Sequence, residues 1–196
     1  MPEHVQTWVE PQETDTPGVK VMAVSGRTSL RLKSWLPEHT KGARAVTLGG
    51  RALPSQVGAT LSGPTQVLCV GPGEWLLVSQ EREAPSLRES LEPDLSAQGL
   101  VCVDLTDGLA VLEVRGAAVR EILSKGCGLD FHPHSFPAGR CARTRFAQIP
   151  LVVACFDEPP RFELYVARSY FHYLHSWLTD AAAEFATTSQ ESDGAD

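Results

Sequence analysis

The sequence contains no long hydrophobic run and no long basic run. Nowhere do apolar residues continue for the roughly 18 positions that a membrane-spanning helix needs. Lysine and arginine number 17 against 24 acidic residues, which gives a formal charge of −7 at pH 7. A negative chain without a basic patch repels both nucleic-acid phosphates and anionic lipids. We therefore expect no nucleic acid and no membrane among its partners.

A secretory signal and a disulfide framework are also lacking. Residues 1–18 are acidic and contain proline, without the basic start and apolar core of a signal peptide. The cysteines are odd in number and widely spaced, and no two form a C-x-x-C pair: Cys69, Cys102, Cys127, Cys141 and Cys155. These features predict a reduced, cytoplasmic protein.

The composition is that of a globular domain, with 42% hydrophobic and 21% charged residues. A chain of 196 residues suits one domain or two closely packed lobes. Both ends are polar and show no periodicity. We expect a flexible segment over residues 1–18, a single domain over 19–185 with lobes at about 19–100 and 101–185, and a disordered tail over 186–196.

Apolar alternation and turn residues predict the elements of the first half of the chain. The expected strands cover residues 19–24, 28–35, 65–70 and 74–79. Ser25-Gly26 and Gly71-Pro72-Gly73 are expected to form hairpin turns within each successive pair of strands. A helix over 85–92 is expected to begin at a capping box formed by Ser86 and Glu89, with Pro93 breaking or restarting it.

The second half mixes hairpins with helical crossovers. Thr106-Asp107-Gly108 is a hairpin signal between strands over 100–105 and 109–114. A helix over 116–126, strands over 143–149, 151–156 and 162–167, and a helix over 169–185 follow. This order predicts an α+β fold rather than a doubly wound parallel sheet, with a split βαβ lobe after residue 101.

The last helix carries an apolar stripe that covers about half of its circumference, wider than the ~100° of a helix with one buried side. Either the helix lies deep in the core, or it packs on its own sheet and also contacts another protein. The second alternative makes aromatic residues of this helix candidate partner contacts: Tyr170, Phe171, Tyr173 and Trp177.

The stretch VGPGEWLLVS (residues 70–79) has the glycines of a ligand loop but not its chemistry. A phosphate loop needs converging backbone N–H groups that lead into a helix. Here Pro72 removes one donor, Glu74 adds a repelling charge, and a strand follows. We interpret the stretch as a tight corner that delivers Trp75 into the interior.

The next motif combines cysteine and histidine residues, and it could be either a metal site or a structural loop. Cys127, His132, His134 and Cys141 match no standard zinc spacing, so a surface loop pinned by Phe131 and Phe136 is favoured and no metal site is expected.

Three arginines follow this loop: Arg140, Arg143 and Arg145. They could grip an anion, but protection of an edge strand or a salt-bridged protein interface is favoured. Neither G-x-S-x-G nor H-E-x-x-H occurs, and the sequence indicates no catalytic residue and no cofactor-binding residue.

Several of these segments together resemble a known family. They are Gly71-Pro-x-Glu74-Trp75-Leu76, Gly126-Cys127-x-Leu129-Asp130, Phe136-Pro137-x-Gly139 and Cys141-x-Arg143-Thr144. In combination they resemble the gamma subunit of heterotetrameric sarcosine oxidase, over most of the chain from about Gly71 to Leu178.

The resemblance implies a fold and a function. The fold would be similar to the N-terminal folate-binding domain of the glycine-cleavage T-protein, with two packed ferredoxin-like (split βαβ) lobes. The complex would oxidise sarcosine to glycine and reduce O2 to H2O2, and the methyl carbon would leave as formaldehyde or as methylenetetrahydrofolate. The partners would be alpha, beta and delta subunits, and FAD, FMN, NAD and tetrahydrofolate would belong to those subunits.

One departure affects the function. The resemblance implies an acidic residue after the glycine turn of a hairpin that here should be RFAQIPLVVACF (residues 145–156), but residues 149–153 are Ile-Pro-Leu-Val-Val and no carboxylate occurs before Asp157. Aliphatic side chains cannot perform its proton chemistry. The favoured hypothesis is therefore a non-catalytic assembly subunit. The alternatives are a stand-alone folate-binding protein and a subunit of a related N-methyl amino-acid dehydrogenase.

Overall fold

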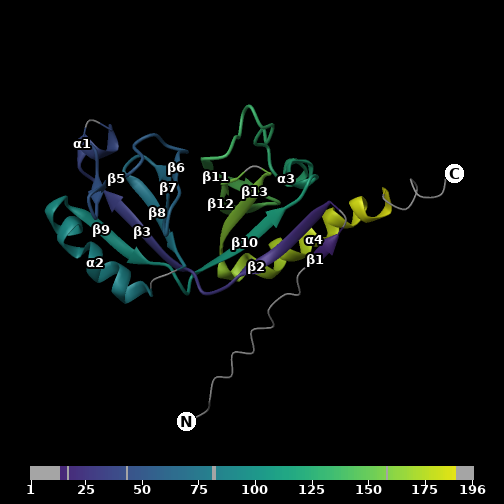
Figure 1. The fold of residues 1–196 in the computed structure, drawn as a ribbon, viewed down its shortest axis with the longest axis horizontal. Coiled ribbons are helices and arrows are strands. Elements are labelled where there is room, and N and C mark those ends of the chain that lie inside the picture. Colours follow the sequence, from purple (N-terminus) through teal and green to yellow (C-terminus); the bar gives the residue numbers. More distant parts are fainter. Residues whose placement is uncertain (1–13, 17, 43, 81–82, 158, 189–196) are drawn as a thin grey trace, which may run out of the picture.

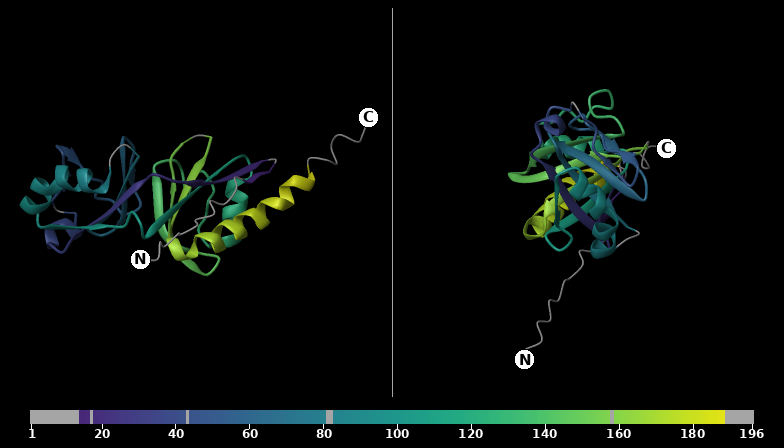
Figure 2. Two further views of the ribbon diagram at one scale, coloured as in Figure 1. Left: turned by 90° about the horizontal axis from the view of Figure 1, so that it is seen from below. Right: turned by 90° about the vertical axis from the view of Figure 1, so that its left-hand side faces the viewer.

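The computed structural model describes residues 14–16, 18–42, 44–80, 83–157 and 159–188. Two large antiparallel sheets lie face to face, and helices cover their outer sides (Figure 1). Seen from below, the five-stranded sheet with its helix lies on the left and the six-stranded sheet with its helices on the right (Figure 2). The fold is thus mixed α/β with antiparallel sheets.

The five-stranded sheet has the order β6-β7-β8-β3-β9. Its strands are β6 Thr60–Leu61, β7 Thr65–Gly71, β8 Glu74–Ser79, β3 Thr28–Ser34 and β9 Leu100–Asp104. Helix α2 (Ala84–Ala97) packs on its outer face, and a small sheet of β4 (Thr47–Leu48) and β5 (Arg51–Ala52) lies beside α2. The short helix α1 covers Pro37–Thr40.

The six-stranded sheet has the order β1-β2-β10-β13-β12-β11. Its strands are β1 Thr14–Thr16, β2 Val19–Val24, β10 Leu109–Arg115, β13 Arg161–Ala167, β12 Ile149–Cys155 and β11 Arg140–Phe146. Helices α3 (Val119–Gly126) and α4 (Phe171–Thr188) contact each other, and α4 also contacts β1 and β2. The single-turn helix η1 (Arg168–Tyr170) precedes α4.

At both ends of the described chain, secondary structure extends beyond the expected domain of residues 19–185. Within the segment 1–18, residues Thr14–Thr16 pair with Val19–Val21 as β1, and residues 1–13 and 17 lie outside the described residues. At the other end α4 continues to Thr188, and residues 189–196 of the expected tail lie outside the described residues. Among the helices of the described residues, none combines the length and the apolar character needed to cross a bilayer.

Two expected hairpins are wrong. Ser25-Gly26 does not fold β3 back on β2, because β2 pairs with β1 and β10 whereas β3 pairs with β8 and β9. Thr106-Asp107-Gly108 likewise connects β9 in one sheet to β10 in the other. In both places the burial of each strand under a different set of helices outweighs the local turn preference. The five-stranded sheet is therefore formed by residues 28–104, between two segments of the six-stranded sheet.

The expected start and break of α2 are also wrong. The helix begins at Ala84, after Glu83 and with Pro85 in its first turn, so Ser86 is already inside it and no side chain caps it. It then continues through Pro93. Leu87, Leu91 and Leu95 are buried against the sheet, and this burial outweighs the hydrogen bond that Pro93 cannot donate.

The glycine corner after Val70 is confirmed as a hairpin turn. β7 and β8 pair on either side of it, and Gly73 has a φ of +63° that favours glycine. Trp75 is delivered into the core with 2% exposure, and its Nε1 donates to the Pro54 carbonyl at 2.8 Å. The structure thus supports the interpretation of this stretch as a tight corner, and not the alternative of a phosphate-binding loop.

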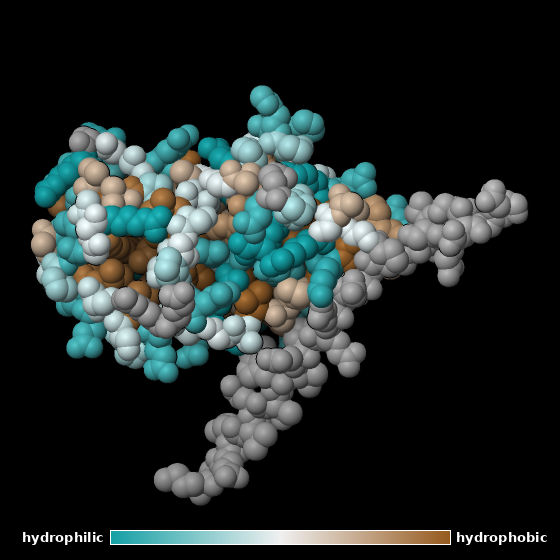
Figure 3. Space-filling view, viewed as in Figure 1, coloured by the Kyte–Doolittle hydropathy of each residue, from teal (hydrophilic) through white to brown (hydrophobic). Residues whose placement is uncertain are grey.

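Three apolar clusters hold these layers together. The largest fills the space between the six-stranded sheet and α3 and α4, and a second lies between the five-stranded sheet and α2. The third joins the sheets through Leu68, Val70, Leu76 and Val78 on one side and Val111, Cys141, Ala154, Phe156 and Tyr165 on the other. In the space-filling view, apolar side chains are visible in a hollow within the left half of the molecule, while polar ones cover most of the remaining visible face (Figure 3).

The sheets are also joined along one edge. The amide of Cys141 in β11 donates to the Gly58 carbonyl at 2.7 Å, and Thr60 N donates to the Gly139 carbonyl at 3.0 Å. Gly58 has a φ of +88°, and a Cβ there would lie 3.0 Å from the Cys141 carbonyl. This close approach requires glycine.

The turn between β11 and β12 departs from the expected strand over 143–149. Both of its residues have positive φ values, 44° at Ala147 and 79° at Gln148, in a two-residue hairpin where glycine or asparagine is preferred. Tertiary contacts hold it, since Ala147 N donates to the Gly126 carbonyl and the Tyr173 hydroxyl donates to the Ala147 carbonyl, each at 2.8 Å.

We expect Gln148→Gly to raise the free energy of unfolding by about 0.5–1 kcal/mol, because glycine adopts a positive φ without crowding its Cβ. Urea unfolding followed by circular dichroism measures the change. Gln148→Ala is the matched control, since it removes the amide but keeps the Cβ and should bring no gain. Equal stability of the two variants would contradict the account of this turn.

Candidate functional site

A cluster of buried charges lies between the two sheets. Glu113 of β10 and Glu163 of β13 are directly opposite each other in the sheet register, with exposures of 3% and 0%. Arg27, just before β3, donates from Nη1 to Glu163 at 2.7 Å. Glu163 also accepts from Arg161 and from the hydroxyl of Tyr165. Each charge that folding removes from water is thus paired.

Strand alternation explains how the chain places these groups. Arg161, Glu163 and Tyr165 are two residues apart on β13 and therefore face the other sheet. The intervening Phe162 and Leu164 face α3 and α4 in the largest core cluster. One strand therefore supplies both an apolar outer face and a polar inner face.

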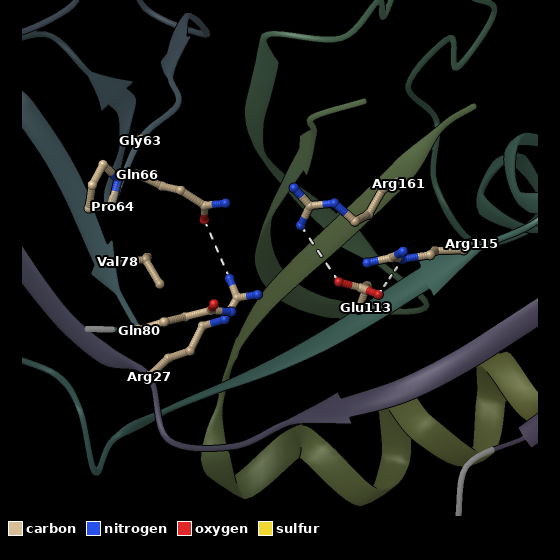
Figure 4. A pocket seen from close by; sticks show the side chains of 9 residues that line it. All are labelled: Arg27, Gly63, Pro64, Gln66, Val78, Gln80, Glu113, Arg115 and Arg161. Carbon is tan, nitrogen blue, oxygen red and sulfur yellow. Dashed lines mark hydrogen bonds and ion pairs between the residues drawn. The ribbon is translucent and has the colours of Figure 1, made fainter. Parts of the chain in front are cut away.

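The charged cluster lines a cavity of about 530 Å³ between the sheets (Figure 4). Arg27, Gln66 and Gln80 approach from the side of the five-stranded sheet, and Glu113, Arg115 and Arg161 from the six-stranded sheet (Figure 4). Arg115 also pairs with Glu113, and Arg161 Nη1 lies 3.6 Å from the second oxygen of Glu113. The guanidinium groups thus neutralise the carboxylates of the wall.

The protonation state of Tyr165 is fixed by the same burial. Burial, the charge of Glu163 and the hydrogen bond to it hold the pKa of Tyr165 well above its usual value. The phenol therefore stays protonated and donates to the carboxylate. An arrangement of this kind locks two sheets together, and it leaves neither carboxylate available as a free base.

A second ion cluster lies elsewhere along the interface between the sheets. Glu74, at the start of β8, is 6% exposed and pairs with Arg31 of β3 at 2.5 Å and with Arg143 of β11. Burial would raise the pKa of Glu74, but the hydrogen bond and charge of Arg143 and the charge of Arg31 outweigh it and lower this pKa. Together with Val152, Tyr165 and neighbouring apolar residues these groups line a small cavity of about 140 Å³.

The arginines predicted from the sequence do not form one patch. Arg143 pairs with Glu74 across the sheets, and Arg145 donates to the Gln148 carbonyl at 3.0 Å. Arg140 lies three residues from Arg143 and hence on the opposite face of β11, near Gly58. Arg143 and Arg145 nevertheless lie on an edge strand, where charged side chains discourage pairing with another chain.

The aromatic residues of the last helix divide into two groups. Phe171 belongs to the core with 5% exposure, and Trp177 packs edge-to-face on Phe146 with a ring separation of 4.8 Å. Tyr170 and Tyr173 are exposed, at 41% and 47%. Of the four aromatic residues predicted as partner contacts, these two tyrosines are therefore the exposed ones, and Tyr170 lies in η1, just before the helix.

The loop with two histidines follows the simpler interpretation. Phe131 and Phe136 are buried with ring centroids 5.5 Å apart, and His132 and His134 are exposed. Among the described residues, no group of histidine, cysteine and acidic side chains is placed to hold a metal.

The thiols follow the same pattern. None of the five cysteines, all of which lie in the described residues, forms a disulfide, and burial, together with the nearby Cys69, raises the pKa of Cys141 to about 12. The Cys141 thiol therefore stays protonated and packs as an apolar group.

Sequence reasoning missed two features. The buried Glu113 and Glu163 were signalled only by a single carboxylate inside an otherwise apolar strand, in LAVLEV and FELYVA. The other feature is a surface of exposed apolar side chains at the end of β3 and on β9: Trp35, Leu36, Val101 and Val103. The run LVCVDL predicted a strand but not its exposed face, because alternation is hard to see where nearly every residue is apolar.

The fold of this chain is similar to that of a protein of known structure. Its structure is similar to the glycine cleavage system aminomethyltransferase T from Bartonella henselae, with a TM-score of 0.61 and 12% identity, over 83% of this chain and 46% of that one. At this identity the likeness concerns the fold alone.

A closer likeness is found to a chain of the heterotetrameric sarcosine oxidase from Corynebacterium sp. U-96, solved in complex with pyrrole 2-carboxylate. The TM-score is 0.74 and the identity 28%, over 88% of each chain. The family model of the sarcosine oxidase gamma subunit matches residues 39–184.

Relatives of the same family are similar in sequence. The sarcosine oxidase subunit gamma of Corynebacterium sp. (strain U-96) is 33% identical over 171 residues, which are 86% of this chain and 81% of that protein. The subunit gamma of Arthrobacter sp is 35% identical over 142 residues, which are 70% of this chain and 68% of that protein. The chain therefore belongs to the sarcosine oxidase gamma subunit family.

We expect Glu163→Gln to lower the free energy of unfolding by about 3 kcal/mol, because a neutral amide leaves Arg27 and Arg161 without their shared buried counter-ion. Urea unfolding at neutral pH measures the loss. Glu184→Gln serves as the control, since its pair with Lys125 is exposed and pairs of this kind contribute at most about 1 kcal/mol. Similar effects of the two substitutions would contradict a role for the inter-sheet cluster in stability.

We expect Glu74 to contribute to acid unfolding. Because its pKa is lowered in the folded state, its stabilisation is present above the unfolded value of about 4.5 and is lost as pH falls through the folded pKa. The free energy of unfolding, measured from pH 6 to pH 3, should therefore fall less steeply below about pH 4.5 in Glu74→Gln than in the wild type. Parallel pH profiles would show that Glu74 is not held as described.

Proposed function

We propose that this chain is a non-catalytic subunit of a heterotetrameric sarcosine oxidase, where it stabilises an assembly with alpha, beta and delta subunits. The observation that carries the proposal is the match over 88% of both chains to a chain of a heterotetrameric sarcosine oxidase, with the family model across residues 39–184 in support. The buried charges favour it as well, since Glu74, Glu113 and Glu163 are each paired within the chain.

The reaction of the proposed complex balances without a group from this chain. Sarcosine, water and O2 would give glycine, formaldehyde and H2O2, and in the presence of tetrahydrofolate the methyl carbon would leave as the methylene form. FAD, FMN, NAD and tetrahydrofolate would be held by the other subunits. The absence of a disulfide among the five cysteines, which all lie in the described part of the chain, supports a cytoplasmic location for this assembly.

The residues present do not fit the folate chemistry that the resemblance to T-protein-like domains implies. In strand β12, where the resemblance would place that acid, Leu151 and Val153 are buried in the core and Pro150 and Val152 occupy the other face. No position from 149 to 153 supplies a carboxylate. We therefore assign no step through tetrahydrofolate to this chain.

We infer further that the six-stranded sheet with α3 and α4 is a ferredoxin-like lobe. Four neighbours in the sheet have the order β2-β10-β13-β12, with a helix after β10 and another after β13, which supports a split βαβ arrangement. The strand that completes it, β2, would come from the N-terminal side of the chain. The five-stranded sheet with α2 would form the second lobe.

Co-expression tests the assembly. We expect an affinity-tagged copy of this chain to retain the alpha, beta and delta subunits through size-exclusion chromatography. We also expect complexes prepared without it to have a lower melting temperature, with sarcosine-dependent H2O2 production per flavin unchanged at low temperature. The unchanged rate follows from the absence of a catalytic role for this chain.

Two results would contradict the proposal. A tagged chain that elutes as a monomer under gentle conditions would remove the assembly role. Heat released when tetrahydrofolate is titrated into the isolated chain would favour the stand-alone folate-binding protein instead. Titration with buffer alone is the control for heats of dilution.

A further inference from the structure

The two outer strands of the sheets are protected differently. β11 ends the six-stranded sheet and carries exposed arginines at alternate positions, Arg143 and Arg145. β9 ends the five-stranded sheet at the outer margin of the molecule (Figure 1), and its alternate positions on one face are Val101 and Val103. Charges discourage an added strand, whereas exposed valines on an open edge favour one.

The valines of β9 extend into a larger apolar surface. Val101 is 42% exposed and Val103 48%, and Trp35, just beyond the end of β3, is 65% exposed. In the register of β3 and β9, Val101 lies opposite Lys33 and Val103 opposite Arg31. Because cross-strand neighbours share a face, these valines, Lys33 and Arg31 form one continuous surface, which Trp35 continues two residues beyond Lys33.

The charge of this surface distinguishes among possible occupants. The Lys33 ammonium lies 5.9 Å from the centre of the Trp35 ring, and no ion pair of Lys33 occurs in the described part of the chain. Arg31 is 41% exposed beside it. Arg31 is already paired with Glu74, so a second copy of this chain would bring a further Lys33 to the same place, whereas an acidic segment would neutralise the Lys33 that is there.

We propose that the open edge of β9, with Trp35, Val101 and Val103, is the docking site for an extended acidic segment of a larger subunit of the same oxidase. The segment would pair with β9 as an additional strand. Its alternate apolar side chains would cover the two valines and the Trp35 ring, and an aspartate or glutamate would pair with Lys33. This inference rests on the proposed assembly function and adds the surface and the partner chemistry to it.

The test uses the full chain, affinity-tagged and co-expressed with the alpha, beta and delta subunits. Val103→Glu places a like charge against the acidic segment, and we expect at least a tenfold drop in the amount of larger subunits captured per tagged chain. Val57→Glu is the matched control, since Val57 is exposed to nearly the same extent, 47%, away from β9. Its capture should equal that of the wild type.

Two further variants separate docking from folding and from simple loss of apolar area. If Val103→Glu lowers the melting temperature, a loss of capture could result from misfolding. Trp35→Ala then tests the docking site alone, because a side chain as exposed as Trp35 contributes little to the stability of the fold. Lys33→Glu reverses the charge without touching the valines and should also weaken capture. A loss with each of them supports the proposal.

The outcomes distinguish this inference from the function on which it rests. Capture by the wild type that survives Val103→Glu and Trp35→Ala would overturn the β9 site and leave the assembly function standing. No capture by the wild type would overturn the assembly function itself. A wild-type dimer that Val103→Glu converts to a monomer would overturn the acidic partner in favour of a second copy.

Discussion

The pairing of buried glutamates with arginines between the sheets is the constraint on which the rest of this structure depends. Glu163 has no contact with solvent, so its charge is tolerated only because Arg27 and Arg161 neutralise it. Arg161 lies on the same strand as Glu163, whereas Arg27 comes from the five-stranded side, so the Arg27–Glu163 pair forms only when the sheets meet in one arrangement. Apolar contacts between the sheets supply the buried area, and the ion pairs between them determine how the two sheets are placed relative to each other.

The same groups fill the interior between the sheets with charges that are already paired. A cavity that binds a ligand needs polar groups whose partners are missing until the ligand arrives. In this chain the carboxylates between the sheets already have guanidinium partners, and residues 149–153 of β12 are aliphatic. On the outside, the large exposed apolar side chains of the described residues include those on β9 and at the end of β3, Val57, and the two tyrosines Tyr170 and Tyr173.

Local features of the fold could be predicted from the sequence. The glycine corner before Trp75, the strands on either side of it and the last helix follow from turn residues and periodicity alone. Which strands pair could not be predicted in the same way, because Ser25-Gly26 and Thr106-Asp107-Gly108 have the composition of hairpins and yet connect two sheets. The predictions of a helix break at Pro93 and of a strand through Ala147 and Gln148 were wrong for a related reason. In both places, packing against distant parts of the chain outweighed the local preference. Of the candidate site, the sequence identified Arg143 and the aromatic residues near the last helix. The ion pair of Arg143 could not be predicted, because its partner Glu74 is distant in sequence. The core position of Phe171 could not be predicted either, because it depends on packing.

The two connections between the sheets lie beside each other, since Leu105 N donates to the Ser29 carbonyl at 2.8 Å and Ser29 N donates to the Thr106 hydroxyl at 3.1 Å. The chain therefore leaves the six-stranded sheet, completes the other sheet, and returns to almost the same point. Mechanically, a pull on the two chain ends would be borne by the six-stranded sheet alone, while the remainder would be carried as a closed loop under no tension. Such an arrangement lets one half of the molecule be exchanged or reshaped as a unit while the other half keeps its path.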